Sequence, residues 1–224
     1  STHIHPTEHE SDFFLRTLSE HGISVPPPGK GCMDINIGLK DEEEFQQWLK
    51  MSRIERGRVL VGIGVGSKMQ EKRWPLERFK EITMRMVDEH NVFPIFFGGS
   101  EDFESAQEII EFCKIGSNAC GSLSLRGAIR ALAECELYVG NDTGTMHMAV
   151  AAGIRCVVVF SARDVPGKWY PYGDGHIVHR EIVACEGCML YECHVQARLC
   201  LTRIQAKDVF RSCASILTAK VEND

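Results

Sequence analysis

From Arg58 onward, short apolar runs alternate with longer segments in which apolar residues recur at a helical period. The apolar runs VLVGIGV, VFPIFF, SNACG, ELYVG and CVVVF predict five strands. Helices are predicted over residues 76–90, 101–114, 123–133, from residue 143, and over 205–217. Strands this apolar, separated by helices, indicate a parallel sheet covered on both faces. We therefore predict an α/β fold with a Rossmann-like doubly wound parallel sheet, whose ligands bind beyond the carboxyl ends of the strands.

The first quarter of the chain has a different pattern. Two helices are predicted there, over residues 8–21 and over DEEEFQQWLK, and GISVPPPGKG between them interrupts helix and strand alike. We divide the chain into an N-terminal helix and linker segment, residues 1–57, and a Rossmann-like domain, residues 58–224.

The composition argues against some classes of protein function. Charged residues make up 25% and hydrophobic residues 44% of the 224 residues, which is ordinary for a globular protein. The net charge of −6 argues against a nucleic-acid-binding surface. No apolar run has the length needed to span a bilayer, and the polar start STHIHPTEHE matches no targeting signal. We expect a cytoplasmic protein that binds no nucleic acid and is not transmembrane.

The stretch VGNDTGTMHMAVAAGI contains a polar hinge between a predicted strand and a predicted helix. Asp142 and Thr143 are favourable N-cap residues, and Gly144 lets another molecule approach the backbone. The start of a helix favours an anion such as phosphate, and His147 adds a possible cationic donor beside it. An ordinary capped loop is the alternative interpretation.

Two further loops carry candidate binding groups. After the first strand, GVGSKMQEKRWP matches neither the dinucleotide fingerprint nor the P-loop pattern, but Ser67 offers a hydroxyl and Lys72 a point charge for a phosphate. After the second strand, FFGGSEDF places Glu101 where carboxylates bind ribose hydroxyls in dinucleotide folds. A solvated basic face and a purely structural turn are the respective alternatives.

These loops together resemble glycosyltransferase family 9, which includes the ADP-heptose:lipopolysaccharide heptosyltransferases. GVGSKMQEKRWP, FFGGSEDF, GSLSLRGAIRALAECELYVGNDTGTMHMAVAAGI and KWYPYG follow the family's order, and the resemblance covers most of residues 58–217. Its DTGxxH core consists of Asp142, Thr143, Gly144 and His147. By this resemblance, Ser67 and Lys72 bind donor phosphates, Glu101 binds the ribose, and the DTGxxH core holds the diphosphate of a nucleotide sugar.

The resemblance also implies a larger architecture. The family has the GT-B fold, in which two Rossmann-like domains face each other across a cleft and the C-terminal one holds the donor. The chain resembles that C-terminal half, and residues 1–57 resemble the last helix of the other domain with the interdomain linker. The acceptor domain, with the carboxylate taken as general base, has no counterpart here. The catalytic residue is therefore unknown, and the chain by itself is expected to be inactive.

The function that the resemblance implies is transfer of a sugar in lipopolysaccharide or surface glycan synthesis. The partners would be an ADP-heptose-like donor and a glycan or lipid-linked acceptor, at the inner membrane face if the protein is peripheral. No cofactor is expected for the transfer itself. A non-catalytic nucleotide-binding module and a sugar-nucleotide epimerase-like protein are the alternatives.

Ten cysteines are many for a chain of this length, and four of them are clustered within residues 185–200. These four, which we call the cysteine cluster, are Cys185, Cys188, Cys193 and Cys200. Four thiolates complete a tetrahedral structural zinc site, although the spacing of the second pair is irregular for the usual zinc ribbons and fingers. A structural zinc ion is one interpretation, and free or redox-variable thiols are the other.

Overall fold

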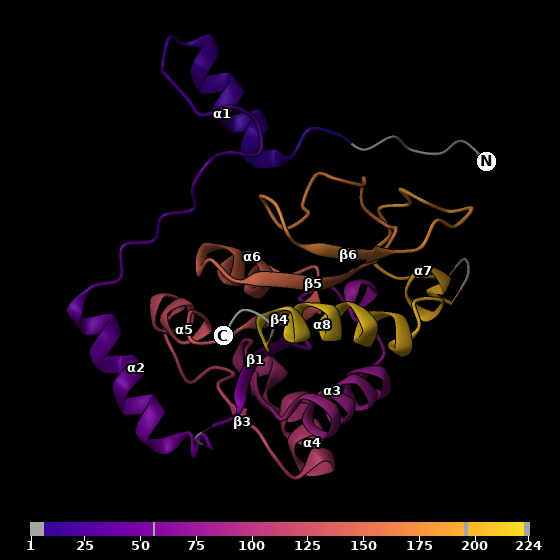
Figure 1. Cartoon of the computed structure of the whole chain (residues 1–224). Coiled ribbons are helices and arrows are strands. Elements are labelled where there is room, and N and C mark those ends of the chain that lie inside the picture. The colour runs from indigo at the N-terminus through magenta and orange to yellow at the C-terminus, as the bar shows by residue number, and fades with distance from the viewer. Residues whose placement is uncertain (1–6, 56, 195–196, 222–224) are drawn as a thin grey trace.

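The computed structural model describes residues 7–55, 57–194 and 197–221. Its centre is a sheet of six strands in the order β3-β2-β1-β4-β5-β6, and every neighbouring pair is parallel (Figure 1). This order is that of the Rossmann fold. The predicted doubly wound parallel sheet is therefore confirmed. The strands are β1 (Val59–Gly64), β2 (Val92–Phe96), β3 (Ser117–Asn118), β4 (Leu137–Asn141), β5 (Arg155–Phe160) and β6 (Ile177–Arg180).

Helices cover both faces of the sheet, because successive residues of each strand point to opposite faces and most strand residues are apolar. Val61, Val139 and Val157 face one helical layer, formed by α3 (Leu76–His90), α4 (Phe103–Cys113) and α8 (Ala206–Val221). Tyr138 and Val158 face the other layer, formed by α2 (Leu39–Met51), α5 (Leu125–Leu132) and α6 (Gly144–Ala151). Three further helices are short: η1 (Gln70–Lys72), η2 (Ser100–Asp102) and α7 (Leu199–Thr202).

The sixth strand, β6, is a correction to the five strands expected from the sequence. It pairs with β5 at one edge of the sheet, and all four of its residues are only partly buried. Its sequence IVHR has two apolar residues followed by His179 and Arg180, so it carries no buried run. An edge strand of this length gives little periodic signal, which is why the pattern did not reveal it.

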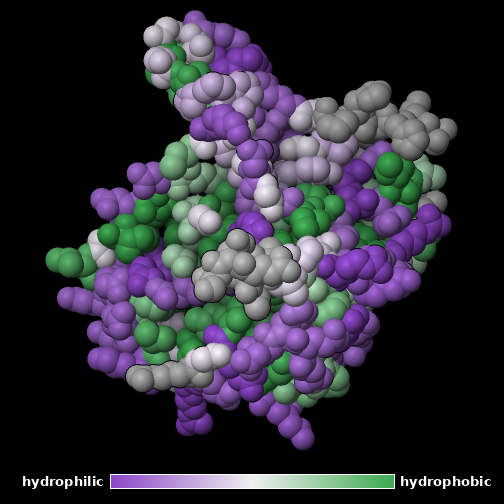
Figure 2. Space-filling model, in the orientation of Figure 1, coloured by the Kyte–Doolittle hydropathy of each residue, from purple (hydrophilic) through white to green (hydrophobic). Residues whose placement is uncertain are grey.

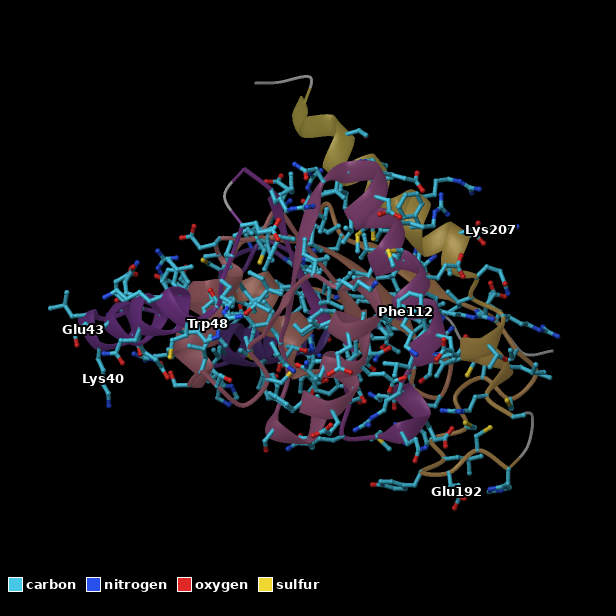
Figure 3. The ribbon with its side chains drawn as sticks, turned by 90° about the horizontal axis from the view of Figure 1, so that it is seen from below. Lys40, Glu43, Trp48, Phe112, Glu192 and Lys207 are labelled. Atoms are coloured by element: carbon cyan, nitrogen blue, oxygen red, sulfur yellow. The ribbon has the colours of Figure 1, made fainter. Side chains whose placement is uncertain are left out.

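The segment before β1 has two helices with different surroundings. The helix α2 buries Phe45 and Trp48 against the sheet side of the molecule, while Lys40 and Glu43 point outward (Figure 3). By contrast, α1 (Glu10–Glu20) buries no residue and projects from the body as a separate lobe (Figures 1 and 2). The division of the chain at residue 57 stays a prediction.

The start of α1 is nevertheless attached to the loop between β5 and β6, residues 161–175, which we call the 161–175 loop. The backbone nitrogen of Glu10 donates to the carbonyl of Lys168 at 3.0 Å. The Tyr172 hydroxyl donates to Asp12 Oδ1 at 2.6 Å and accepts from the backbone nitrogen of Gly31 at 3.1 Å. This loop is therefore held by hydrogen bonds from residues of the N-terminal segment.

Candidate functional site

A cavity of about 660 Å³ opens at the carboxyl ends of the strands. Its volume lies within the usual range for small-molecule sites. The lining comes from the loops that follow β1, β2, β3, β4 and β5, together with the first turns of α5 and α6. All the predicted donor-binding residues line it: Ser67, Lys72, Glu101, Asp142, Thr143, Gly144 and His147. The structure therefore brings residues that are up to 80 positions apart into one site.

The cavity lies at the point where the strand order reverses, between β1 and β4. Asn141, the last residue of β4, is fully buried there and connects the two strand ends. Its side-chain nitrogen donates to the Val65 carbonyl at 2.8 Å, and its side-chain oxygen accepts from the Trp74 backbone nitrogen at 2.9 Å. The first residue of the hinge thus holds the loop after β1 in place beside the hinge.

The hinge itself starts α6, with Thr143 as the N-cap residue. No side chain caps this helix, however, because the Asp142 carboxylate pairs with Lys72 and Thr143 makes no capping bond. Thr143 is thus the N-cap residue by position, as expected, but neither its side chain nor that of Asp142 makes a capping hydrogen bond, and the first amides of α6 stay without a side-chain partner. At Gly144 a side chain would meet nothing within 4 Å, so the backbone there is open to the cavity.

Lys72 lies between two carboxylates. Its Nζ is 2.6 Å from Asp142 Oδ2 and 2.6 Å from Asp164 Oδ2, and all three side chains are largely buried. Burial opposes the charge on Lys72, but attraction to Asp142 and Asp164 outweighs burial and raises the pKa of Lys72. Burial raises the pKa of Asp142, and attraction to Lys72 offsets part of that effect. Lys72 is thus a buried cation that already has two counter-ions.

His147 lines the same cavity but is not a cation. Its burial lowers its pKa to about 4, and the positive charges of His9 and Lys72 act in the same direction. At neutral pH the ring is therefore neutral, and it can donate one hydrogen bond. The expectation of a cationic donor at this position is wrong, because the site is too buried and too close to Lys72 to keep a second positive charge.

Ser67 and Glu101 differ in their exposure. Ser67 is buried, and its hydroxyl accepts from the Met69 backbone nitrogen at 3.3 Å. Glu101 is exposed at the start of η2, so its carboxylate is accessible to a ligand. The Asp102 carboxylate occupies the space where a side chain at Gly66 would lie, 2.0 Å from its position. Gly66 is thus required by the close approach of Asp102 to the backbone.

The ion pair at the site involves a residue that was missed from the sequence. Asp164 comes from the 161–175 loop and pairs with Lys72, and Trp169 of the same loop lines the cavity. Arg163 donates through Nη1 to Asp164 Oδ1 at 2.7 Å, and through Nε and Nη2 to the carbonyls of Leu190 and Met189. The segment SARDVPGKWYPYG has no periodicity, so only its charged pair Arg163-Asp164 in an otherwise apolar strand end gave a signal.

The four residues of the cysteine cluster line a second, smaller cavity on the other side of Arg163. None of them forms a disulfide. Burial is the main cause that raises the pKa of Cys200, which favours the neutral thiol. In the part of the chain that the structure describes, no three His, Cys, Asp or Glu side chains are placed to hold a metal ion. The cluster is therefore assembled in space, but its sulfur atoms do not converge on one point. Glu192, between Cys188 and Cys193, lies at the outer edge of the molecule (Figure 3).

Three comparisons with known proteins bear on this site. The profile of glycosyltransferase family 9 (heptosyltransferase) matches residues 31–198. Lipooligosaccharide heptosyltransferase 2 of Campylobacter jejuni (strain 81116) is 23% identical over 220 residues, which are 96% of this chain and 66% of that protein. The other curated C. jejuni relative is covered over 53% of its length, so the chain spans about half to two thirds of these relatives.

Solved structures give the same fold. The glycosyl transferase family 9 structure from Veillonella parvula superposes with a TM-score of 0.77 at 22% identity, over 97% of this chain and 62% of that one. The E. coli heptosyltransferase WaaC with ADP superposes with a TM-score of 0.64 at 21% identity, over 96% of this chain and 59% of that one. Among the described residues, no helix is long and apolar enough to cross a membrane.

Proposed function

The chain belongs to glycosyltransferase family 9, and we propose that it is the donor-binding half of a heptosyltransferase-like enzyme of lipopolysaccharide or surface glycan synthesis. The observation that carries the proposal is the convergence of the predicted residues around one cavity at the switch point of the sheet. Ligands of open α/β sheets bind at that point. Family membership favours a transferase over a non-catalytic nucleotide-binding module or an epimerase.

The proposed ligand is an ADP-heptose-like nucleotide sugar. Its diphosphate would lie against the start of α6, where the open backbone at Gly144 and the uncapped amides favour an anion. Lys72 and Ser67 would bind phosphate oxygens, and the accessible Glu101 carboxylate would accept from the ribose hydroxyls. The E. coli heptosyltransferase WaaC was solved with ADP, which supports a nucleoside diphosphate as the probe for this chain.

The chemical role of this half is to stabilise the leaving group. In sugar transfer the bond between the sugar and the diphosphate breaks, and the electron pair goes to the diphosphate oxygen. Negative charge then grows on the phosphates, where the helix start and Lys72 are already in place. His147 is neutral and contributes a hydrogen bond rather than a charge. No cofactor is proposed for this step.

The rest of the reaction lies outside this site. No residue of the cavity is assigned as the general base, and we propose that the base and the glycan or lipid-linked acceptor belong to a second domain of the complete enzyme. The proposed location is the cytoplasm, at the inner face of the membrane if the acceptor is lipid-linked.

Calorimetric titration of this chain with ADP, UDP, GDP and CDP tests the proposal. We expect ADP to bind most tightly, and we expect Lys72→Ala to weaken ADP by about one to two decades, because a charge-assisted hydrogen bond contributes roughly 1.5–3 kcal/mol. Lys207→Ala is the matched control, since Lys207 is exposed on α8 (Figure 3) and does not line the cavity. Binding of none of the four nucleotides, or equal binding by Lys72→Ala, would contradict the proposal.

For the cysteine cluster we propose a structural zinc ion as a separate assignment. Its support is that the four cysteines line one cavity. The described side chains do not fit the metal as they stand, so the thiols would have to turn inward and lose their protons to reach tetrahedral geometry. Elemental analysis of freshly reduced protein should then find about one equivalent of zinc. Absence of stoichiometric metal, with Cys188→Ser unfolding at the same temperature as the parent, would leave the free-thiol interpretation.

A further inference from the structure

The lysine of the proposed phosphate site is occupied in the structure by two carboxylates at equal distances, 2.6 Å from each. The two contacts differ in quality. Asp142 Oδ2 accepts a well-aligned hydrogen bond from Lys72 Nζ, whereas Asp164 Oδ2, which is also buried, meets Lys72 as an ion pair of poorer hydrogen-bond alignment. A diphosphate can reach Lys72 only by competing with one of these two groups, because the Lys72 side chain is only 14% exposed.

The two carboxylates also differ in how they are held. Asp142 directly follows β4, and its backbone nitrogen donates to the Val159 carbonyl at 3.2 Å, so its position is fixed by the sheet. Asp164 belongs to the irregular 161–175 loop, and its other oxygen accepts from Arg163. Asp164 can therefore give up Lys72 and keep a cationic partner, whereas Asp142 has no second cation within ion-pair distance among the described contacts.

We propose that Asp164 determines how tightly the site binds a diphosphate, because its carboxylate occupies the phosphate position on Lys72 when no donor is bound and is displaced by the diphosphate of the donor. This inference rests on the proposed function and deepens it. Loss of a residue that contacts the ligand-binding lysine would ordinarily weaken ligand binding. Loss of the Asp164 charge should instead strengthen anion binding, because it removes both the competitor for Lys72 and its repulsion of the anion.

The same competition affects diphosphates and monophosphates differently. A diphosphate has one phosphoryl group for the start of α6 and another to replace the Asp164 carboxylate on Lys72, so its binding includes the cost of displacing Asp164. A monophosphate can bind at the start of α6 and leave Asp164 in place, so it avoids that cost. Removal of the Asp164 charge should therefore help ADP more than AMP, and it should raise the ratio of their affinities.

The variant that tests this is Asp164→Asn. The asparagine oxygen can still accept from Arg163 Nη1, so the anchor of the loop is preserved while the charge on Lys72 is lost. Asp164→Ser is the second variant, which removes the carboxylate without placing an amide next to the lysine. Asp174→Asn is the matched control, because Asp174 ends the same loop, pairs with Lys30 and has a side chain that is 86% exposed. Thermal unfolding establishes that each protein is folded before titration.

The probes are ADP, AMP and inorganic pyrophosphate, each titrated by calorimetry. We expect Asp164→Asn and Asp164→Ser to bind ADP and pyrophosphate roughly tenfold more tightly than the parent. A gain of this size is expected when one repulsive contact between like charges is removed from a partly screened site. We expect a smaller gain for AMP, and no change from Asp174→Asn. Unchanged or weaker ADP binding by both Asp164 variants, with ADP bound by the parent, would overturn the inference alone. Failure of the parent and all variants to bind ADP or pyrophosphate would overturn the proposed function, and the inference with it.

Discussion

Gly144 offers a perturbation whose effects on stability and on binding have opposite signs. It is the first residue of α6, its φ angle is not in the left-handed region, and an added Cβ would meet no atom within 4 Å. Gly144→Ala should therefore leave the free fold intact. A methyl group there projects into the space where the diphosphate is proposed to approach the backbone.

The magnitudes follow from these two facts. Replacement of glycine by alanine at a compatible position stabilises a protein by about 0.4–1 kcal/mol, because it restricts the unfolded chain. For a protein of this size that raises the unfolding temperature by a few degrees at most. A diphosphate held away from the helix start loses about one charge-assisted hydrogen bond, so ADP affinity should fall by roughly one to two decades. Gly144→Val should lower it further.

Differential scanning calorimetry and isothermal titration with ADP measure the two quantities on the same preparation. Gly38→Ala is the control, because Gly38 is also at the start of a helix, α2, and does not line the cavity. It should change neither ADP affinity nor the lining. ADP affinity unchanged in both Gly144→Ala and Gly144→Val would refute the reasoning, since the hinge would then be only a capped loop.

Two other predictions concern pH and the 161–175 loop. The pKa of His147 is lowered in the folded state from 6.5 to about 4, so the unfolded state binds more protons than the folded state between these pH values. The free energy of unfolding should therefore fall by up to about 3 kcal/mol as pH drops from about 6.5 to 4. Urea unfolding across this range should show a smaller loss for His147→Gln than for the parent, and an equal loss would contradict the burial of the ring. Tyr172→Phe removes the hydroxyl that joins the 161–175 loop to Asp12 and Gly31, so Trp169 should become more accessible to acrylamide. Fluorescence quenching reports mainly on Trp169 because the other two tryptophans are buried, and unchanged quenching would mean that the hydroxyl does not hold the loop.

The sheet and the location of the site could be predicted from the sequence because both depend on repeated local patterns. Apolar runs such as VLVGIGV and VFPIFF are buried on both faces, and the carboxyl ends of their strands must meet at one edge. The candidate binding residues line one cavity for the same reason, since each lies in a loop or helix start that follows one of these runs. The prediction for Leu76–His90 matches α3 at both ends, because Pro75 precedes the helix and Asn91 ends it in the left-handed conformation.

The interactions within the site could not be predicted, because they join residues without a common pattern. Asp142 is a favourable N-cap residue in isolation, but a buried lysine from another loop is a stronger partner than a backbone amide. The protonation state of His147 depends on burial and on the nearby Lys72, and neither can be read from local sequence. Asp164 lies in a segment without periodicity, and its pairing with Lys72 has no local signal in the sequence.

The ion-pair arrangement around Lys72 also explains why an empty anion site of this kind needs carboxylates at all. A lysine with 14% of its side chain exposed would be strongly destabilised without a counter-ion, since desolvation of an unpaired charge costs several kcal/mol. Asp142 and Asp164 remove that cost in the absence of donor, and the pKa of Lys72 stays raised. The groups that make the empty pocket stable are consequently the groups with which a diphosphate must compete. If Asp164→Asn binds ADP more tightly, it should also unfold at a lower temperature than the parent without ligand, and this difference should shrink at saturating ADP because the phosphates then supply the missing charge.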